Sequence, residues 1–167
     1  MGVCEHDGDT ISAVATPPGE GGIGIVRLSG ERALAIADKV FKARDGKSAV
    51  AQKDFTAKFG HVVSDGKKID EALLLVMRGP KSYTGEDTVE IQAHGGPALM
   101  QTLLERTVHF GARPAAPGEF TKRAFLNGRL DLIKAEAVLD LIQAKTERSL
   151  RWAAAQLDGD LSRKMKV

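Results

Sequence analysis

The stretch SYTGEDTVEIQAHGGP, residues 82–97, decides the fold because it holds a turn, a strand and the start of a helix. Residues 88–93 alternate apolar and polar side chains, which is the pattern of a strand with one buried face. The sequence HGGP then opens a helix expected from about Ala98 to Phe110. Proline is favourable in a first helical turn, where its missing N–H is not needed. Strand and helix therefore follow one another directly at this point.

Strand-like and helix-like segments also alternate before this stretch. Strands are expected at residues 11–16, 23–29, 55–63 and 69–77, and a helix is expected at 31–43. Asp65-Gly66 between the last two strands is a strong hairpin signal. After the helix that Gly111 ends, residues 112–116 are expected to form a last short strand.

The pattern changes at Pro117-Gly118, after which only helical periodicity remains. A short helix around Phe120–Phe125 is followed by one that Asp131 caps and that runs to about Thr146. A final helix is expected to hold the apolar positions Leu150, Ala154, Leu157, Leu161 and Met165. The fold class is therefore α+β, with a mixed-sheet α/β domain at residues 1–118 and an incomplete helical domain at 119–167. The wide apolar faces of these helices need partners.

Composition is typical of a folded protein and excludes several classes. Hydrophobic residues make up 43% of the chain and charged residues 28%, and the net charge of +2 does not by itself imply nucleic-acid binding. Cys4 is the only cysteine, which excludes an internal disulfide and favours a reducing compartment. We expect no secretion signal and no membrane span, since the longest apolar run is residues 72–77. A cytoplasmic protein is the expectation.

Two glycine motifs resemble nucleotide sites but lack the required context. GEGGIG at residues 19–24 is followed by a strand rather than by the helix that a dinucleotide site needs, so it is interpreted as a turn between strands. Gly46-Lys47-Ser48 resembles the end of a P-loop, but Phe41 stands where that motif requires glycine. The histidines have no metal-ligand spacing, so no metal site is expected.

Two charged residues are candidates for ligand binding. Glu90 is either a solvent-facing carboxylate or a group beside a glycine loop, where its two acceptor oxygens suit an N–H pair on a flat heterocycle. Arg27 interrupts an apolar strand, either because its side chain extends outward to solvent or because it binds an anion in a pocket. The residues alone leave both choices open.

Three blocks, taken together, resemble the N-terminal part of the MnmE (TrmE) family of tRNA modification GTPases. They are DTI with ATPPG and GGIGIVR at 9–27, SYTGEDTVEIQAHGGP at 82–97, and PGEFTKRAFLNGRLDL at 117–132. AEA at 135–137 and DLI at 140–142 continue the third block. The likeness runs from about Asp9 to Leu161.

The resemblance implies an N-terminal domain of the tetrahydrofolate-binding type that forms a homodimer. It implies 5-formyltetrahydrofolate as ligand, and places the family's folate contacts on Arg27, Glu90 and Arg129. The last position is lysine in some relatives, and arginine keeps the charge but changes the hydrogen-bond geometry. We assign no metal ligand and no catalytic residue to this chain.

The family acts on tRNA together with an FAD-containing protein of the MnmG type and modifies carbon 5 of the wobble uridine. GTP and potassium bind a GTPase domain that this sequence lacks, so we expect a fragment that binds folate and dimerises without hydrolysing GTP. Two alternatives remain open. One is a dimerisation module without ligand, and the other is a folate-dependent one-carbon transferase with His94 or Asp87 as acid–base group.

Overall fold

Seven strands form one mixed sheet, and two helices pack on it, in the computed structural model, which describes residues 8–159. The chain divides into two compact units. The first holds the residues up to Ser82 and Glu86–Ala116, and the second holds Tyr83–Gly85 and the residues from Pro117 onward. The α+β class is confirmed.

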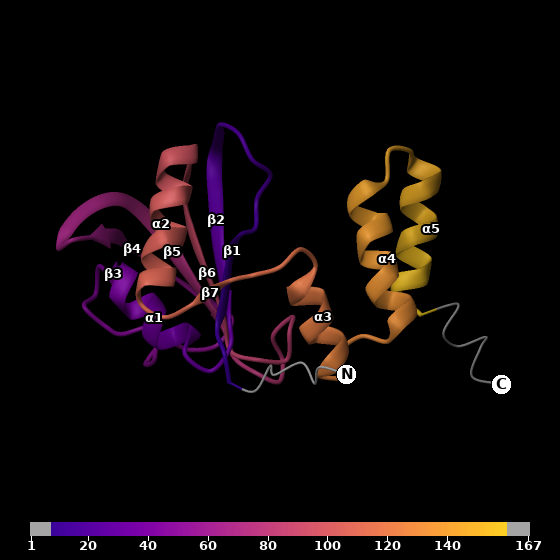
Figure 1. The fold of residues 1–167 in the computed structure, drawn as a ribbon, viewed down its shortest axis with the longest axis horizontal. Coiled ribbons are helices and arrows are strands. Elements are labelled where there is room, and N and C mark those ends of the chain that lie inside the picture. Colours follow the sequence, from indigo (N-terminus) through magenta and orange to yellow (C-terminus); the bar gives the residue numbers. More distant parts are fainter. Residues whose placement is uncertain (1–7, 160–167) are drawn as a thin grey trace. The chain divides into compact units, whose positions relative to one another are not determined.

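The first unit contains all the strands. Its elements in chain order are β1 (Ile11–Val14), β2 (Gly21–Ser29), α1 (Ala33–Val40), β3 (Phe41–Ala43), β4 (Thr56–Ser64), β5 (Lys67–Met77), β6 (Thr88–Gly95), α2 (Pro97–His109) and β7 (Arg113–Pro114). The strand order is β3-β4-β5-β6-β2-β1-β7. Every neighbouring pair is antiparallel except β1 and β7, which are parallel. Strands β2 and β6 are therefore central, as Figure 1 shows.

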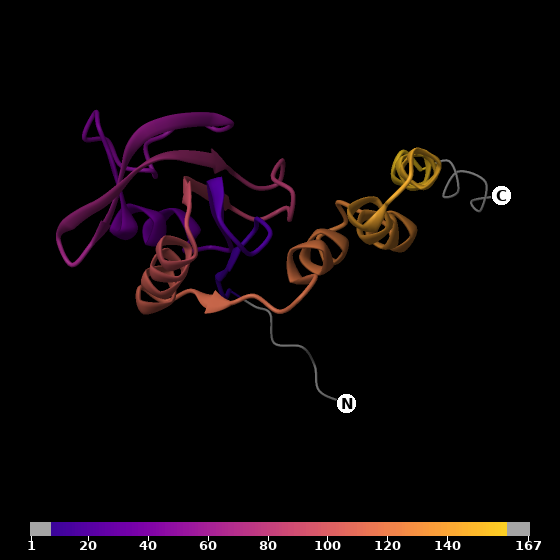
Figure 2. The ribbon, with the colours of Figure 1, turned by 90° about the horizontal axis from the view of Figure 1, so that it is seen from above.

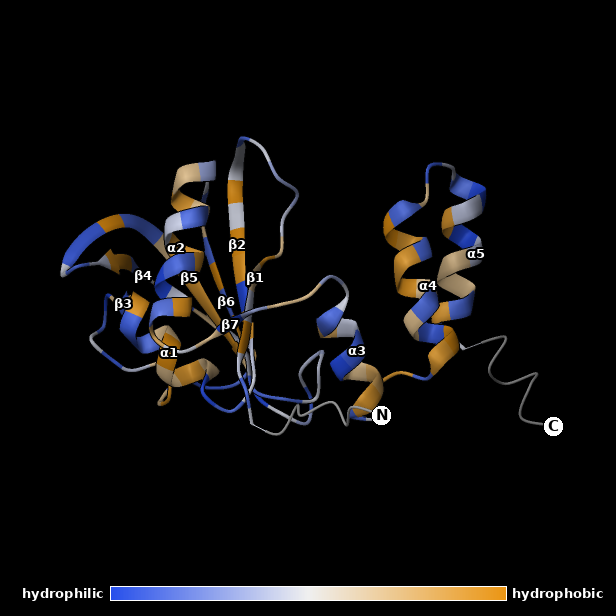
Figure 3. Cartoon of the chain, viewed as in Figure 1, coloured by the Kyte–Doolittle hydropathy of each residue, from blue (hydrophilic) through white to orange (hydrophobic). Residues whose placement is uncertain are grey.

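Helices α1 and α2 lie on the same side of the sheet (Figure 2). The core forms between these helices and the apolar residues of the central strands. It includes Val26, Leu74 and Ile91 of the strands and Leu103 of α2, which are exposed by 1% or less. Each buried side chain of this kind contributes about 1.5–3 kcal/mol to stability. Apolar positions recur along the central strands in Figure 3, as expected for strands that bury one face. The opposite face of the sheet carries no helix of this unit, and we call it the open face.

The predicted hairpin is confirmed, and its two turn residues explain it. Asp65 and Gly66 have φ values of 50° and 76°, the left-handed backbone that a two-residue turn between antiparallel strands requires. The same turn places Lys67 opposite Ser64. Strand β4 pairs with β5 from Thr56 to Ser64, with one register irregularity between Val62 and Val63.

One expected helix is shorter than its periodicity indicated. The helix predicted at 31–43 ends at Val40, and Phe41–Ala43 is strand β3, paired with residues 60–62 of β4. The Phe41 ring lies where a side chain on Gly60 would be, so glycine at that position makes room for the strand. Tertiary pairing thus overrides a local helical pattern.

The second unit, as far as residue 159, contains three helices: α3 (Glu119–Leu126), α4 (Leu132–Gln143) and α5 (Glu147–Leu157). Asp131 caps α4 as expected, and its side chain accepts a hydrogen bond from the Lys134 N–H. Helix α4 ends before Thr146, because the Thr146 side chain caps α5 instead. Leu161 and Met165 of the expected final helix, and Cys4, lie outside the described residues.

No helix in the described part of the chain has the length and apolar character needed to cross a membrane.

Candidate functional site

The centre of the open face carries two charged side chains that come from neighbouring central strands. Arg27 on β2 lies directly opposite Glu90 on β6 in the antiparallel register. Their neighbours Val26, Val89 and Ile91 point into the core on the other face. The alternation that buries those residues is what presents Arg27 and Glu90 together on the open face.

Arg27 and Glu90 form a close ion pair. Arg27 Nε donates to Glu90 Oε1 at 2.8 Å, and Arg27 Nη2 lies 2.7 Å from the same oxygen. Glu90 is only 8% exposed, so the alternative of a solvent-facing carboxylate is wrong. The Arg27 side chain keeps 30% of its surface exposed. The guanidinium therefore reaches both the buried carboxylate and the surface.

The second carboxylate oxygen of Glu90 is less well satisfied. Within residues 8–159 its partner is the side-chain amide of Gln92, at a long 3.4 Å. A carboxylate oxygen has room for two hydrogen bonds. The pair thus fixes the orientation of Glu90 through one oxygen and leaves acceptor capacity on the other.

Arg129, the third expected contact, belongs to the second unit. It follows the left-handed Gly128 after α3, and its backbone N–H donates to the Ala124 carbonyl. Its exposed side chain passes near Gly85 of the same unit, and Asn127 fixes that segment by donating to the Thr84 carbonyl at 2.7 Å. The structure thus brings Arg27 and Glu90 together in the first unit and places Arg129 on the second.

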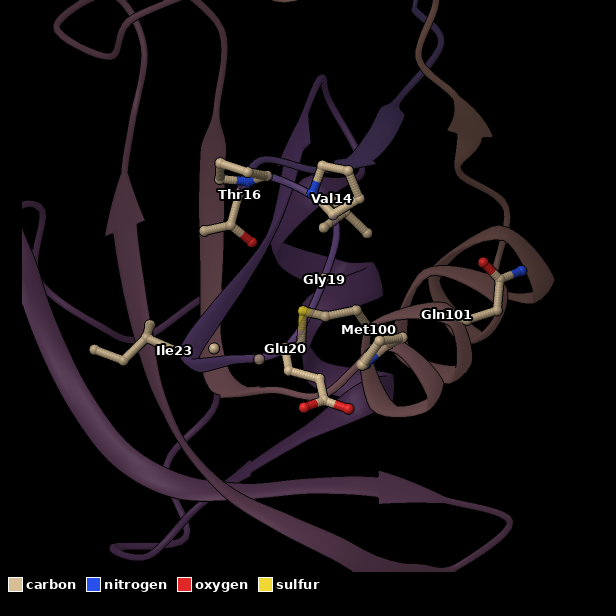
Figure 4. Close-up of a pocket in the computed structure, with 12 residues that line it drawn as sticks. Val14, Thr16, Gly19, Glu20, Ile23, Met100 and Gln101 are labelled. Atoms are coloured by element: carbon tan, nitrogen blue, oxygen red, sulfur yellow. The ribbon is translucent and has the colours of Figure 1, made fainter.

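A separate hollow lies beneath the β1–β2 loop. It has a volume of about 600 Å³ and is lined by the loop, the end of β6 and the start of α2, but neither Arg27 nor Glu90 lines it. Figure 4 shows Met100 of α2 extending toward the loop, while Ile23 points away from Met100. The GEGGIG motif ends this loop with Gly19 and Glu20, and its last four residues already belong to β2, which begins at Gly21. A strand rather than a helix therefore follows the glycines, but the turn is shorter than the motif.

The sequence did not predict that His94 and Asp70 form a hydrogen-bonded pair. His94 Nδ1 lies 2.8 and 3.0 Å from the two carboxylate oxygens of Asp70, and the His94 N–H donates to Asp70 Oδ2 at 2.9 Å. Burial by itself would raise the pKa of the Asp70 carboxyl, but these hydrogen bonds outweigh it and hold that pKa below its ordinary value. The residues are 24 positions apart, and the β5–β6 register that joins them has no local sequence signal.

Among the residues that the structure describes, no three His, Cys, Asp or Glu side chains gather in a way that could hold a metal ion.

Comparison with known proteins identifies relatives over nearly the whole chain. Residues 10–129 match the family model described as the N-terminus of the GTP-binding protein TrmE. The chain is 56% identical over 154 residues to the tRNA modification GTPase MnmE of Symbiobacterium thermophilum. It is 54% identical over 157 residues to the protein of that name from Lysinibacillus sphaericus, and 55% identical over 161 residues to that from Carboxydothermus hydrogenoformans.

These alignments cover 92–95% of this chain but only 34–35% of the relatives. The chain thus spans about a third of the length of the curated relatives that it matches.

Proposed function

We propose, on the premise that the chain belongs to the MnmE (TrmE) family of tRNA modification GTPases, that its sheet unit binds a formylated tetrahydrofolate and forms a homodimer. The ligand class is 5-formyltetrahydrofolate. The observation that carries the proposal is the Arg27–Glu90 pair on the open face. A nearly buried ion pair contributes little net stability and is costly to desolvate, which favours a binding role over a purely structural one.

Glu90 holds the heterocycle in this proposal. Glu90 Oε1 is occupied by Arg27, and Oε2 has only the long contact to Gln92 in the described chain. A pterin presents neighbouring N–H groups on one edge, which are the donors that a carboxylate oxygen accepts. The Arg27 guanidinium then binds carbonyl, formyl or glutamate oxygens of the ligand. The family resemblance adds Arg129 as a further contact to these oxygens.

The dimer covers the open face in this proposal. Ile23, Phe59 and Leu73 expose 67%, 41% and 41% of their surface there. Large apolar side chains grouped on one face, with no helix of their own unit over them, favour a protein interface. A second copy of the chain is the occupant that the family relationship supports, and it would enclose the ligand near the interface.

The proposed role of this chain in a larger activity is based on its relatives, whose names specify tRNA modification and GTP hydrolysis. This chain would supply the one-carbon donor to the modification of carbon 5 of the wobble uridine in tRNA, together with an FAD-containing protein of the MnmG type. Its 167 residues contain no P-loop sequence, so they would not hydrolyse GTP by themselves.

Isothermal titration with 5-formyltetrahydrofolate tests the ligand proposal. The wild-type chain should bind with measurable heat, and Glu90→Ala should weaken binding by at least tenfold, since the site loses the carboxylate that accepts charge-assisted hydrogen bonds from the ligand. Glu105→Ala is the control, because Glu105 is an exposed carboxylate on α2. Equal affinities of wild type and Glu90→Ala would remove Glu90 from the site.

A further inference from the structure

The segment between β3 and β4, residues 44–55, is fastened to the sheet by side chains, and we call it the β3–β4 loop. Arg78, which follows β5, donates to the Gln52 and Val50 carbonyls at 2.7 Å. It also donates to the Asp54 carboxylate at 2.7 Å. The buried Gln52 side chain donates to a carbonyl of β5 at 3.1 Å. The loop, which starts from β3 at the edge of the sheet (Figure 1), therefore presents its exposed side chains from a fixed backbone.

The end of this loop exposes an aromatic side chain on an unfavourable backbone. Phe55 has a φ of 54°, in the left-handed region that a bulky residue rarely adopts. Its N–H donates to the Val76 carbonyl at 2.8 Å, which fixes this conformation. Phe55 is nevertheless 54% exposed, so burial of the ring does not offset the strain in full. A strained backbone that displays an aromatic ring to solvent points to a binding role.

The same loop carries three exposed cations without a counter-charge. Arg44, Lys47 and Lys53 form no ion pair within the described part of the chain. The two carboxylates of the loop lie 3.2 and 2.7 Å from cations outside it, those of Lys58 and Arg78. The three uncompensated charges exceed the net charge of the whole chain, which is +2. The loop is therefore a local positive surface that attracts a polyanion.

Strand β4 sets the distance between the ring and the cations. The Arg44 N–H donates to the Phe59 carbonyl at 3.0 Å, so Arg44 lies beside that residue at the edge of β4. Phe55 comes four residues before Phe59, which corresponds to roughly 13 Å at about 3.3 Å per residue. Lys53 is closer to the ring, because the Thr56 hydroxyl donates to the Lys53 carbonyl at 2.6 Å and closes a turn around Phe55. Cations thus accompany the ring over a distance that a few nucleotides span.

Single-stranded RNA is the polyanion that fits this combination of groups. Its phosphates bind uncompensated cations, and its unpaired bases stack on exposed aromatic side chains. A duplex offers phosphates too, but its bases are stacked on one another and cannot use the ring. The proposed function brings RNA to this chain, because its relatives are named for tRNA modification.

We propose that the β3–β4 loop binds single-stranded RNA, with Phe55 stacked on one base and with Arg44, Lys47 and Lys53 bound to phosphates. The inference goes beyond the folate site and rests on the proposed function only for the choice of RNA. The loop is separate from the Arg27–Glu90 pair, which lies on strands beyond β5. The two sites can therefore be tested independently.

The test separates the contribution of the charges from that of the ring. Fluorescence anisotropy measures binding of the full chain to a labelled oligouridylate of about ten nucleotides, a usual site size, at several salt concentrations. Three phosphate contacts predict a slope of about −2 in a plot of log association constant against log salt concentration. Lys47→Ala and Lys53→Ala should each make this slope shallower by about 0.7. Phe55→Leu should weaken binding roughly tenfold without changing the slope, because it removes only the stacking face.

Matched controls distinguish a site from a diffuse effect of charge. Lys67→Ala, at an exposed lysine at the start of β5, should leave the affinity and the slope as in the wild type. Phe55→Trp should keep the wild-type affinity, because it retains an aromatic face on the same backbone. An RNA duplex of the same length should bind more weakly than the single strand, and Phe55→Leu should not change its binding.

Three results would overturn the inference. They are an affinity for the oligouridylate that Phe55→Leu leaves unchanged, an effect of Lys67→Ala as large as that of Lys53→Ala, and no binding by the wild type at about 50 mM salt. Titration of Lys53→Ala and Phe55→Leu with 5-formyltetrahydrofolate keeps the two proposals apart, because both variants should bind it as the wild type does. A wild type that binds the RNA but not the folate would overturn only the proposed folate site.

Discussion

Glu90 Oε1 accepts a hydrogen bond from Arg27 Nε and lies 2.7 Å from Arg27 Nη2, from a position directly across the β2–β6 ladder. The carboxylate is nearly buried while the guanidinium is partly exposed. This geometry fixes the orientation of the Glu90 carboxylate and leaves its second oxygen able to accept hydrogen bonds from a ligand.

Glu90→Gln should destabilise the fold by about 1–3 kcal/mol, because a half-buried guanidinium loses its counter-charge. The partial exposure of Arg27 puts the loss below that of a fully buried pair. Urea unfolding followed by circular dichroism measures it. Glu105→Gln, at an exposed carboxylate hydrogen-bonded by Gln101, should change stability by less than about 0.5 kcal/mol. Equal effects of the two variants would mean that the pair contributes nothing.

Gly95→Ala should disturb the ladder between β2 and β6. A Cβ on Gly95 would lie 2.7 Å from the backbone oxygens of both Gly21 and Ile23. Because these are backbone atoms, a change of side-chain rotamer cannot relieve the clash. We expect a loss of about 1–3 kcal/mol in the free energy of unfolding. Gly22→Ala is the matched control in the same irregular segment, since a Cβ there meets nothing within 4 Å. Equal stabilities of the two variants would contradict the close approach of these strands.

Leu73→Lys should convert the proposed dimer to monomer, because it places a charge in an apolar interface on the open face. Sedimentation velocity at several protein concentrations reports the change. Val50→Lys changes a residue that is 57% exposed in the loop between β3 and β4, and it should leave the dimer intact. A Leu73→Lys chain that sediments as the wild type would place the interface elsewhere.

The Asp70–His94 interaction should lose its stabilising effect in acid. The pKa of Asp70 lies below its ordinary value of 3.8 when the chain is folded, so the carboxylate stabilises the fold above that value. This contribution disappears as pH falls through the lowered pKa. The stability difference between wild type and Asp70→Asn should therefore shrink from about pH 6 to about pH 3. A carboxyl NMR titration of Asp70 with a midpoint above 3.8 would contradict the prediction.

The sequence specified the strands of the sheet well because their signals are local. Alternation placed β6, and Asp65-Gly66 marked the β4–β5 hairpin. The helix expected through residue 43 was too long, because Phe41 pairs with β4 and that choice depends on distant residues.

Part of the candidate site could be predicted from the sequence and part could not. Arg27 and Glu90 were found from their place in apolar strands and from the family resemblance, and the structure puts them side by side. Asp70 and His94 were not paired, because their contact depends on the β5–β6 register rather than on any spacing in the chain. A local pattern assigns a residue to a face, but only the strand order determines which residue lies across from it.

The most direct test of the central claim is to locate the ligand by NMR. Wild-type chain labelled with carbon-13 and nitrogen-15 is titrated with 5-formyltetrahydrofolate, and the Glu90 side-chain carboxyl and Arg27 Nε signals are followed. The account predicts saturable shifts at both groups, with smaller shifts at the Gln92 side-chain amide. Shifts confined to the hollow beneath the β1–β2 loop, at residues such as Thr16 and Met100, with Glu90 and Arg27 unchanged, would contradict it.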